Sequence, residues 1–378
     1  MREVFVAGGG IAPIKAYALG LGRQIAREAG VAALQDVGCT FRDIDALYAG
    51  VAMGASPRAV MVAKEFGLTG LPVHHIVNAS ASGLAATHQA AMAIQSGRHD
   101  LVLVMGYDLP DRAEDPFKAQ GFLPPVTLFA MWAQRRMFEF GTQPKHLAMV
   151  AAKNWNYART NPNAARRADH EITVDEVLAS KTIAPPLTVM MCTPWVFGAA
   201  ALILASKEGL QRLPGIRWPL ARLAGSEAQS EVYGEHHIFE SSVVGPPEIS
   251  RTTVAAALRQ AALSPRDLDI VQVHDAFAIE ELVYYELFGL CQAGEAEDLL
   301  ENGAFGPGSR ARFGLPEVST DGGLIARGHP AGPTGVCQLL ETLRRFRMND
   351  NDRVGLCHLL GAGSTCIAQV LTRADHMK

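Results

Sequence analysis

The sequence predicts an α/β protein built from two similar halves, each with a mixed β-sheet packed between helices. Two observations predict this fold class. Continuous apolar runs such as DLVLVMG, AAALILAS and LDIVQVH have the length of strands that are buried on both faces, and helical segments alternate with them. A stretch near the N-terminus also returns in the second half of the chain, with the same order of helix, loop and strand.

The repeat is clearest between AALQDVGCTFRDIDALYAG at 32–50 and AALRQAALSPRDLDIVQVH at 256–274. In each copy an alanine-rich helix ends, a short loop carries Arg-Asp-aliphatic-Asp, and an apolar strand follows. Chance similarity would explain the helices but not the shared loop. A glycine-bearing turn, a long helix and a buried strand then follow in both halves, at 82–106 and 332–360. Internal duplication is therefore the preferred interpretation.

Two segments of the first half have features of their own. MREVFVAGGG is typical of a first strand, and the glycines of VAGGGIAP predict a tight turn by which this strand leaves its sheet. Residues 107 to about 190 break the alternation of strands and helices and are rich in Pro, Arg, Asn and aromatic residues. This segment predicts an inserted loop domain that shapes a pocket or packs on the core.

Composition restricts the classes of function. Hydrophobic residues make up 48% of the 378 residues and charged residues 19%, as in ordinary globular enzymes. A net charge of −4 gives no reason to expect a nucleic-acid partner. No apolar run is long enough for a membrane span, the N-terminus lacks the layout of a signal peptide, and the six cysteines are scattered without a CxxC pair. We expect free thiols, a cytoplasmic location and no metal site.

Five motifs together resemble the thiolase superfamily, and most closely its sterol-carrier-protein-type branch. In chain order they are NASASG at 78–83, similar to the nucleophile loop; the loop-domain exit at 161–206; HDAF at 274–277; GGLIARGHPAGPTG at 322–335; and the glycine-rich HLLGAGST at 358–365. The motifs fall in the family's order across the whole chain, as does the twofold repeat.

This resemblance implies a thiolase fold, with two duplicated βαβαβαββ halves in a five-layer α-β-α-β-α sandwich. It divides the chain into an N-terminal half (1–106 plus 190–210), an inserted loop domain (107–189) and a C-terminal half (211–378). It also implies acyl-CoA substrates in lipid metabolism and a homodimer or tetramer. No cofactor is expected other than coenzyme A as part of the substrate.

The resemblance also implies the site residues. His329 lies in Gly-His-Pro, where glycine permits close approach, proline fixes the turn and an imidazole can move protons. His274 ends an apolar strand, where α/β folds place active-site groups. With Ser80 these are the expected catalytic positions, and Gly328, Gly361, Gly363, Asp275 and Phe277 are the expected substrate-binding positions. Asp275 either orients its surroundings or caps the following helix, and Phe277 is expected to pack as a wall.

Three positions depart from the family's pattern. Ser80 stands where the family has its nucleophilic cysteine, and a hydroxyl needs a positioned base to react. Leu359 stands where an acid/base cysteine or an asparagine is expected, and Phe197 where aspartate is usual. Ser80 is thus better interpreted as a marker of changed chemistry than as a catalytic serine. A serine introduced in place of a native cysteine would also explain Ser80, but not Leu359.

Three functions remain open on the sequence alone. The first is an acyl-CoA enzyme that does not follow the usual thiolase route. It is either a transferase or thioesterase that acylates Ser80, or an enzyme that cleaves β-hydroxyacyl-CoA or decarboxylates its substrate; aldolases of this family act with a small OB-fold and zinc-ribbon partner. The second is a catalytically silent acyl-CoA or lipid binder. The third is a structural subunit of a thiolase-like complex. The charges available to hold coenzyme A in the loop domain are Arg135, Arg136, Arg159, Arg166 and Arg167, although a solvated arginine face explains each equally well.

Overall fold

The computed structural model describes residues 2–18, 20–52, 58–108, 125–232, 248–361 and 365–376. Its main feature is a mixed sheet of ten strands in the order β10-β9-β11-β12-β8-β1-β7-β4-β2-β3. The first half supplies β1 (Phe5–Lys15), β2 (Ala46–Gly50), β3 (Val73–Ile76), β4 (Leu101–Tyr107) and β7 (Phe197–Ala205). The second half supplies β8 (Leu220–Ser230), β9 (Ile270–Gln272), β10 (Glu317–Val318), β11 (Val354–Gly361) and β12 (Thr365–Ala374).

The two halves of this sheet have the same strand order. Counted from the middle, one half runs β1-β7-β4-β2-β3 and the other β8-β12-β11-β9-β10. They meet where β1 pairs with β8 antiparallel, at Phe5 with Arg222 and Val6 with Ala221. This matching order is the structural form of the repeat in the sequence, and it confirms two duplicated α/β halves.

The aspartates of the repeated loop explain why the loop recurs. Asp45 accepts backbone hydrogen bonds from Asp100 and Leu101 at 2.8 and 2.9 Å, which ties the loop before β2 to the start of β4. Asp269 accepts from Arg353 and Val354, both at 2.9 Å, and ties the loop before β9 to the start of β11. The same residue type thus performs the same pairing in both halves.

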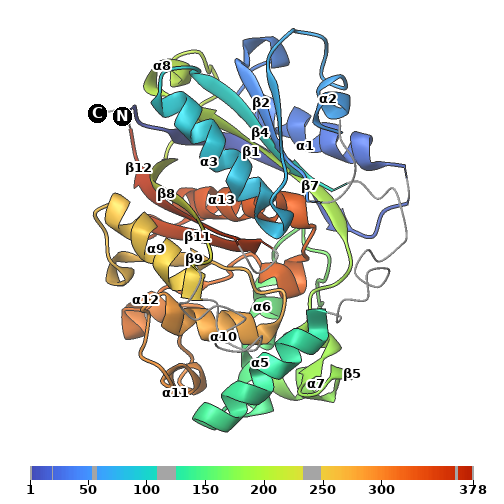
Figure 1. Cartoon of the computed structure of the whole chain (residues 1–378), viewed down its shortest axis with the longest axis vertical. Helices are drawn as coiled ribbons and strands as arrows, with labels where there is room; N and C mark the ends of the chain where they lie inside the picture. Colours follow the sequence, from blue (N-terminus) through green and yellow to red (C-terminus); the bar gives the residue numbers. More distant parts are fainter. Residues whose placement is uncertain are drawn as a thin grey trace.

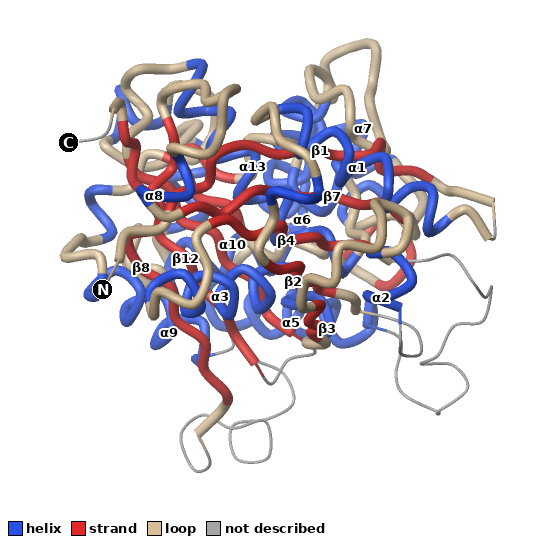
Figure 2. Tube along the Cα trace, turned by 90° about the horizontal axis from the view of Figure 1, so that it is seen from above, coloured by secondary structure: helices blue, strands red, loops and turns tan. Residues whose placement is uncertain are grey.

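Helices form the remaining layers (Figures 1 and 2). Between the two halves of the sheet lie α3 and α13, which pack against each other and against strands of both halves. The outer side of the first half is covered by α1 and α2, and that of the second half by α9 and α10. The bounds are α1 (Gly22–Asp36), α2 (Arg58–Ala63), α3 (Ser82–Gln95), α9 (Glu248–Gln260), α10 (Ala278–Leu287) and α13 (Ala331–Met348). This is the layered thiolase-type α/β fold.

The sequence-predicted turn in VAGGGIAP is wrong. Strand β1 continues through Gly8, Gly9 and Gly10 and pairs with β7 up to Lys15, with two irregularities, between Val6 and Gly8 and between Ala12 and Lys15. The glycines serve close packing instead, because a side chain on Gly10 would meet the backbone and Ala32 of α1 at 2.4–2.8 Å. Small residues therefore let α1 lie directly on the strand.

Several described elements fall between β4 and β7, in the segment that breaks the pattern. They are α5 (Pro125–Phe140), α6 (Pro144–Ala158), α7 (Val174–Ala179), β5 (Thr182–Ala184), β6 (Leu187–Thr188) and the short turn η3 (Val189–Met191). Helix α6 packs against α7, α10 and α11, and α5 packs against α10 and β5. The division of the chain into domains at residues 107, 190 and 211 stays a prediction.

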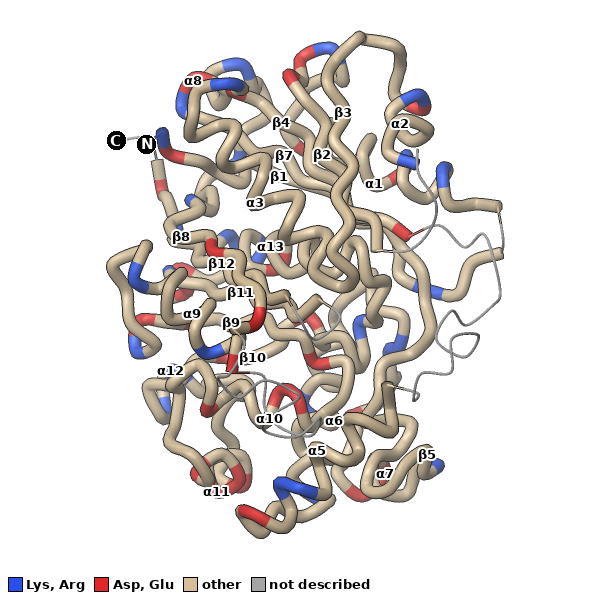
Figure 3. The backbone as a smooth tube through the Cα atoms, in the orientation of Figure 1, with Lys and Arg blue, Asp and Glu red and all other residues tan. Residues whose placement is uncertain are grey.

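Short helices and turns complete the described part of the chain. These elements are α8 (Lys207–Leu210), α11 (Ala296–Glu301), α12 (Ser309–Phe313) and the turns η1 (Phe41–Asp43), η2 (Ala79–Ala81), η4 (Pro265–Asp267) and η5 (Gly323–Arg327). In Figure 3, basic and acidic positions lie together on α8 and α5, α11 carries acidic positions, and the central strands carry few charges. None of the helices in the described part of the chain is long and apolar enough to cross a membrane.

Candidate active site

The turn that carries Ser80 is fixed by its neighbours. Ser82 is fully buried; its Oγ donates to the Ala79 carbonyl at 2.7 Å and accepts from the Asn78 N–H at 2.8 Å. Ala79 has a φ of +43°, in the left-handed region that is strained for alanine. Ser82 therefore holds a strained turn, which places Ser80 just before α3, where the positive end of the helix dipole favours negative charge.

His329 accepts a hydrogen bond from the Ser80 hydroxyl. The Ser80 Oγ lies 2.9 Å from Nε2 of His329, and Nδ1 of the same ring lies 2.9 Å from the Thr334 hydroxyl. Because that hydroxyl donates to the Pro330 carbonyl at 2.8 Å, it accepts from Nδ1–H, and Nε2 of the neutral ring carries the lone pair. Burial lowers the pKa of His329 well below its usual range and keeps the ring neutral. His329 is placed as a base toward Ser80.

His274 lies beside His329; both belong to the second half of the chain, whereas Ser80 belongs to the first. His274 follows β9, and its ring is perpendicular to that of His329, with 5.1 Å between the ring centroids and an interplanar angle of 89°. Its Nδ1 lies 2.8 Å from Oε1 of Glu280, a fully buried carboxylate on α10. Its Nε2 is buried and has no hydrogen-bond partner among the described residues. The structure thus leaves one imidazole nitrogen available beside the Ser80–His329 pair.

Asp275 holds the backbone that leads to His329. Its Oδ1 accepts from the Leu324 N–H at 2.8 Å, and its Oδ2 accepts from the Asn154 side chain at 2.8 Å. Burial and the neighbouring charge of Glu281 raise the pKa of Asp275 well above its usual range. The interpretation that Asp275 orients its surroundings is therefore the better one, although it acts on backbone rather than on an imidazole.

Helix α10 is capped by other groups, so the alternative interpretation of Asp275 as its cap is wrong. The backbone N–H of Phe277 donates to Oε2 of Glu280 at 3.0 Å, as in a capping box. Phe277 itself is buried and stacks on Phe129 with 4.6 Å between ring centroids. It packs as a wall, as the sequence predicted.

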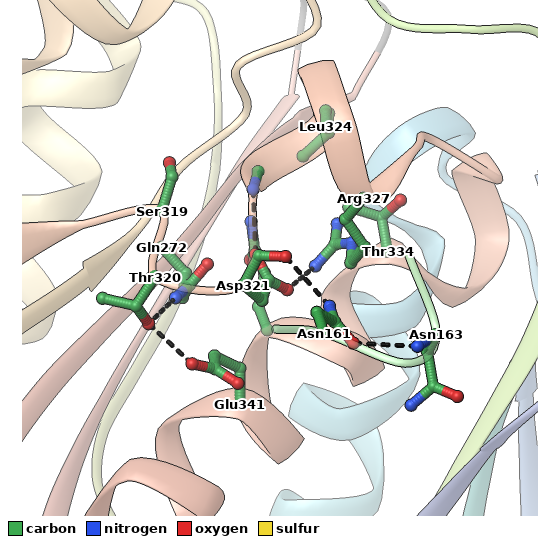
Figure 4. Close-up of polar contacts among 12 residues, drawn as sticks. Asn161, Asn163, Gln272, Ser319, Thr320, Asp321, Leu324, Arg327, Thr334 and Glu341 are labelled. Atoms are coloured by element: carbon green, nitrogen blue, oxygen red, sulfur yellow. Dashed lines mark hydrogen bonds and ion pairs between the residues drawn. The ribbon is translucent and has the colours of Figure 1, made fainter. Parts of the chain in front are cut away.

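A buried ion pair supports the loop before His329 (Figure 4). Arg327 and Asp321 pair at 2.5 Å, and both side chains are almost completely buried. Asn161 donates to the Asp321 carbonyl at 2.9 Å, which joins this loop to the segment after α6 (Figure 4). Gly328 follows with a φ of +105°, which favours glycine, and a side chain there would meet Val196 and Ile14. These contacts fix the direction in which the chain presents His329.

The last glycine-rich loop is described only in part. Gly361 packs against the Ser80 turn, because a side chain there would lie 2.7 Å from the Asn78 carbonyl oxygen. Thr365 also joins the two segments, since its hydroxyl donates to Oδ1 of Asn78 at 2.6 Å. Gly363, which the sequence placed in the site, lies outside the described residues.

Strand β11 places its side chains on two sides of the sheet. Cys357 and Leu359 are fully buried in the central core with α3 and α13. His358 points to the opposite side, where its Nε2 lies 2.9 Å from the Ser250 hydroxyl and its ring packs on Tyr284. Leu359 is therefore an apolar side chain where the family's pattern has a proton-transferring one. Neither Cys357 nor His358 lies in a position to transfer the proton instead.

The loop-domain arginines take different structural roles. Arg136 is buried in an ion pair with Glu286 and Glu297, so the solvated interpretation is wrong for this residue. Arg166 donates to the Cys192 carbonyl at 2.7 Å and is partly buried, while Arg159 and Arg167 are exposed. Arg136 and Arg166 thus stabilise the fold, and a role in holding coenzyme A stays a prediction for the exposed arginines.

Two site residues were missed by sequence reasoning. Glu280 lies six residues after His274 in the sequence, and Thr334 lies five residues after His329. A carboxylate on the first turn of the helix that follows HDAF was a readable signal, because Glu at that position completes a capping box. Nothing in the sequence indicated that Thr334 would fix the protonation pattern of His329, since that depends on the bend at Pro330.

Comparisons with known families agree with this architecture. Residues 233–370 match the family described as thiolase C-terminal domain-like, and residues 55–116 match the N-terminal domain of β-ketoacyl synthases. Among solved structures, the Ltp2-ChsH2(DUF35) aldolase is similar with a TM-score of 0.84 and 25% identity, over 100% of this chain and 99% of that one. Human mitochondrial 3-ketoacyl-CoA thiolase has the same fold, with a TM-score of 0.74 at 18% identity over 98% of both chains.

Curated relatives cover nearly the whole chain. Human sterol carrier protein 2 is 29% identical over 401 residues, which are 97% of this chain and 71% of the relative. An acetyl-CoA acetyltransferase of Methanothermobacter thermautotrophicus is 31% identical over 374 residues, which are 93% of this chain and 94% of the relative. Identity at this level over the full length, together with the layered fold, shows that the chain belongs to the thiolase superfamily.

Proposed function

We propose that this protein makes or breaks a carbon–carbon bond beside the carbonyl group of a coenzyme A thioester, through an enolate and without a cysteine acyl-enzyme. One observation carries the proposal: the ring of His274, whose Nε2 has no partner among the described residues, lies beside the Ser80–His329 pair, with 5.1 Å between the centroids of the two imidazole rings. A donor for a developing enolate oxygen and a base for a hydroxyl proton are what such a reaction needs.

The cleavage of a β-hydroxyacyl-CoA can be written with these groups. His329 Nε2 takes the proton of the β-hydroxyl, directly or through the Ser80 hydroxyl, and the O–H electron pair forms the new carbonyl. The bond between the α and β carbons breaks, and its electron pair becomes the thioester enolate, whose oxygen accepts a hydrogen bond from His274 Nε2–H. The proton on His329 then passes to the α carbon, so the base is regenerated. The products are a ketone or aldehyde and a shortened acyl-CoA.

Three features support carbon–carbon bond cleavage without an acyl-enzyme over a standard thiolase cycle. Ser80 has no thiol to accept an acyl group from coenzyme A in a thioester exchange, and Leu359 cannot move the α proton. The similar solved structure with the TM-score of 0.84 is an aldolase that contains a DUF35 chain. We therefore include a partner of the OB-fold and zinc-ribbon kind in the proposal, and a homodimer or tetramer of this chain as its expected assembly.

A second candidate is acyl transfer to Ser80. The 2.9 Å contact between Ser80 Oγ and His329 Nε2 favours it, because the same contact would activate the hydroxyl as a nucleophile. The product would be an acyl ester on Ser80 and free coenzyme A.

Two measurements on the same preparations separate the candidates. The protein is incubated with a β-hydroxyacyl-CoA, and release of the shortened acyl-CoA is followed by mass spectrometry, with and without a partner of the DUF35 kind. Intact-protein mass is measured after incubation with acetyl-CoA. Cleavage that is lost in His329→Ala, without an adduct, supports the lyase. An adduct that is lost in Ser80→Ala supports the transferase. Binding of the thioester with neither result would leave the silent binder and would overturn both catalytic proposals.

A further inference from the structure

Glu280 is the buried carboxylate that contacts His274. It is fully buried on the first turn of α10, and its Oε1 lies 2.8 Å from Nδ1 of His274. Its other oxygen accepts the Phe277 N–H at 3.0 Å, and the Tyr284 hydroxyl lies 3.4 Å from Oε1. Three donors therefore surround this carboxylate, which fixes both its rotamer and its position relative to the imidazole.

This contact determines the protonation pattern of His274. Because a carboxylate oxygen can only accept, Nδ1 of His274 carries a proton. A neutral His274 would then present a lone pair at Nε2, and so would His329, whose Nε2 accepts from Ser80. Such a site would contain two bases and no imidazole donor for an oxyanion. A proton on Nε2 of His274 removes this difficulty.

We propose that Glu280 is a positioning residue that keeps His274 as an imidazolium, whose Nε2–H is the hydrogen-bond donor to the thioester oxygen. The inference rests on the proposed function of the site and names the residue that keeps the hydrogen-bond donor protonated. A buried carboxylate on one ring nitrogen stabilises positive charge on the ring and orients it, as carboxylate–histidine pairs do in other sites.

Glu280 distinguishes His274 from the other imidazoles near it. The titratable groups near this ring are Glu280 on α10, Asp275 beside it in the chain, His329 from the loop before α13 and His358 from β11. The two other histidines have hydroxyl partners: Thr334 for His329 and Ser250 for His358. Of these three imidazoles, His274 is the one whose ring is hydrogen-bonded to a carboxylate.

The test compares Glu280→Gln with the wild-type protein. Glutamine keeps the size and an oxygen that can accept from Nδ1–H, but it removes the negative charge. In the wild type, nitrogen NMR of histidine-labelled protein at neutral pH is expected to show both nitrogens of His274 protonated, with His274→Gln used for assignment. In Glu280→Gln the Nε2 proton is expected to be lost. The carbonyl stretch of bound carbon-13-labelled acyl-CoA, lowered in the wild type, should return toward its value in solution.

Kinetics give a further readout if turnover is found. Glu280→Gln is expected to lower kcat about 10- to 100-fold with KM nearly unchanged, because the lost donor acts on the enolate more than on the bound thioester. Glu281→Gln is the matched control: this neighbouring buried carboxylate binds Asn154 and Ser319 at 2.8 Å, and its replacement should leave the nitrogen spectrum of His274 unchanged.

The outcomes distinguish this inference from the proposed function. A lone pair at Nε2 in the wild-type spectrum overturns the role of Glu280, even if the variant does not fold. So does a His274 that stays doubly protonated in Glu280→Gln. His274 could be doubly protonated in the wild type while the carbonyl stretch of the thioester is the same bound and in solution. That result would uphold the effect of Glu280 on His274. It would reject the thioester oxygen as the acceptor of the His274 hydrogen bond, and with it the proposed function.

Discussion

The Ser80 hydroxyl and the His329 imidazole form a 2.9 Å hydrogen bond between residues from the two halves of the chain. Its direction is set by Thr334, which faces the other ring nitrogen and donates its own proton to Pro330. Ser80 is therefore the donor in this contact, and the pair is arranged for proton transfer from an oxygen to His329.

We expect Ser80→Cys to create a reactive thiol. The new side chain would lie beside His329 and before α3, where an imidazole and the helix dipole favour the thiolate over an ordinary thiol with a pKa of about 8.5. Alkylation by iodoacetamide should be faster than for the native cysteines, whose pKa values burial raises to about 11 for Cys337 and about 12 for Cys357. Acetyl-CoA should add an acetyl group to the variant, detected by intact mass.

The control for this thiol is the same variant with Thr334→Val. Loss of the Thr334 hydroxyl frees the His329 ring to change its protonation pattern, so alkylation should slow while the fold is retained. An alkylation rate in Ser80→Cys no higher than that of the wild type would contradict the placement of His329 as a base.

Replacement of Leu359 should cost stability rather than restore chemistry. This side chain is fully buried in the central core, so Leu359→Ala is expected to lower the free energy of unfolding by about 2–5 kcal/mol. Leu359→Met keeps the volume and should cost less than about 1.5 kcal/mol. Urea denaturation of the two variants and the wild type measures the difference. Equal stability of the alanine variant would show that Leu359 is not packed in the core.

Removal of the buried charge partner of Arg327 should be strongly destabilising. Asp321→Asn leaves a guanidinium without its counter-ion in a site where both side chains are almost completely buried, which costs about 3–5 kcal/mol. The loop that presents His329 should also shift, so any activity should fall further than stability alone explains. Asp350→Asn removes a carboxylate that is 93% exposed beside Arg373, and little change in denaturation midpoint is expected there.

Stability should decrease as the pH falls below about 6.5. Burial lowers the pKa values of His329 and His358 well below the ordinary value of 6.5, so both rings are neutral in the folded chain. The unfolded chain binds protons at these histidines first, and acid therefore favours unfolding in the range between the unfolded and folded pKa values. Each histidine contributes a slope of up to about 1.4 kcal/mol per pH unit in that range.

Denaturation midpoints between neutral and mildly acidic pH measure this slope. His358→Gln should reduce it, because the side chain no longer titrates while an amide can still bind the Ser250 hydroxyl. The slope of the variant is compared with that of the wild type, which removes the contribution of other groups. An identical slope in the two proteins would mean that His358 is not held neutral in the folded chain.

Much of the fold could be read from local patterns. The repeat, with its Arg-Asp-aliphatic-Asp loop and the following strand, predicted two like halves, because Asp45 and Asp269 tie equivalent strands together in each half. The glycines near the N-terminus predict a turn that the structure does not contain. Glycine is equally compatible with a turn and with a strand on which a helix lies closely, and only the packing of α1 distinguishes the two.

The sequence by itself determined the duplicated α/β architecture, the loops that carry the two histidines, and the absence of a thiol at position 80. These features depend on residue type and order, which are local. The tertiary structure decided which groups meet: Ser80 with His329, His274 with Glu280, and Asp275 with the backbone of Leu324. Hydrogen-bond direction and burial fix the protonation of a histidine, and both arise only when segments far apart in the chain are brought into contact.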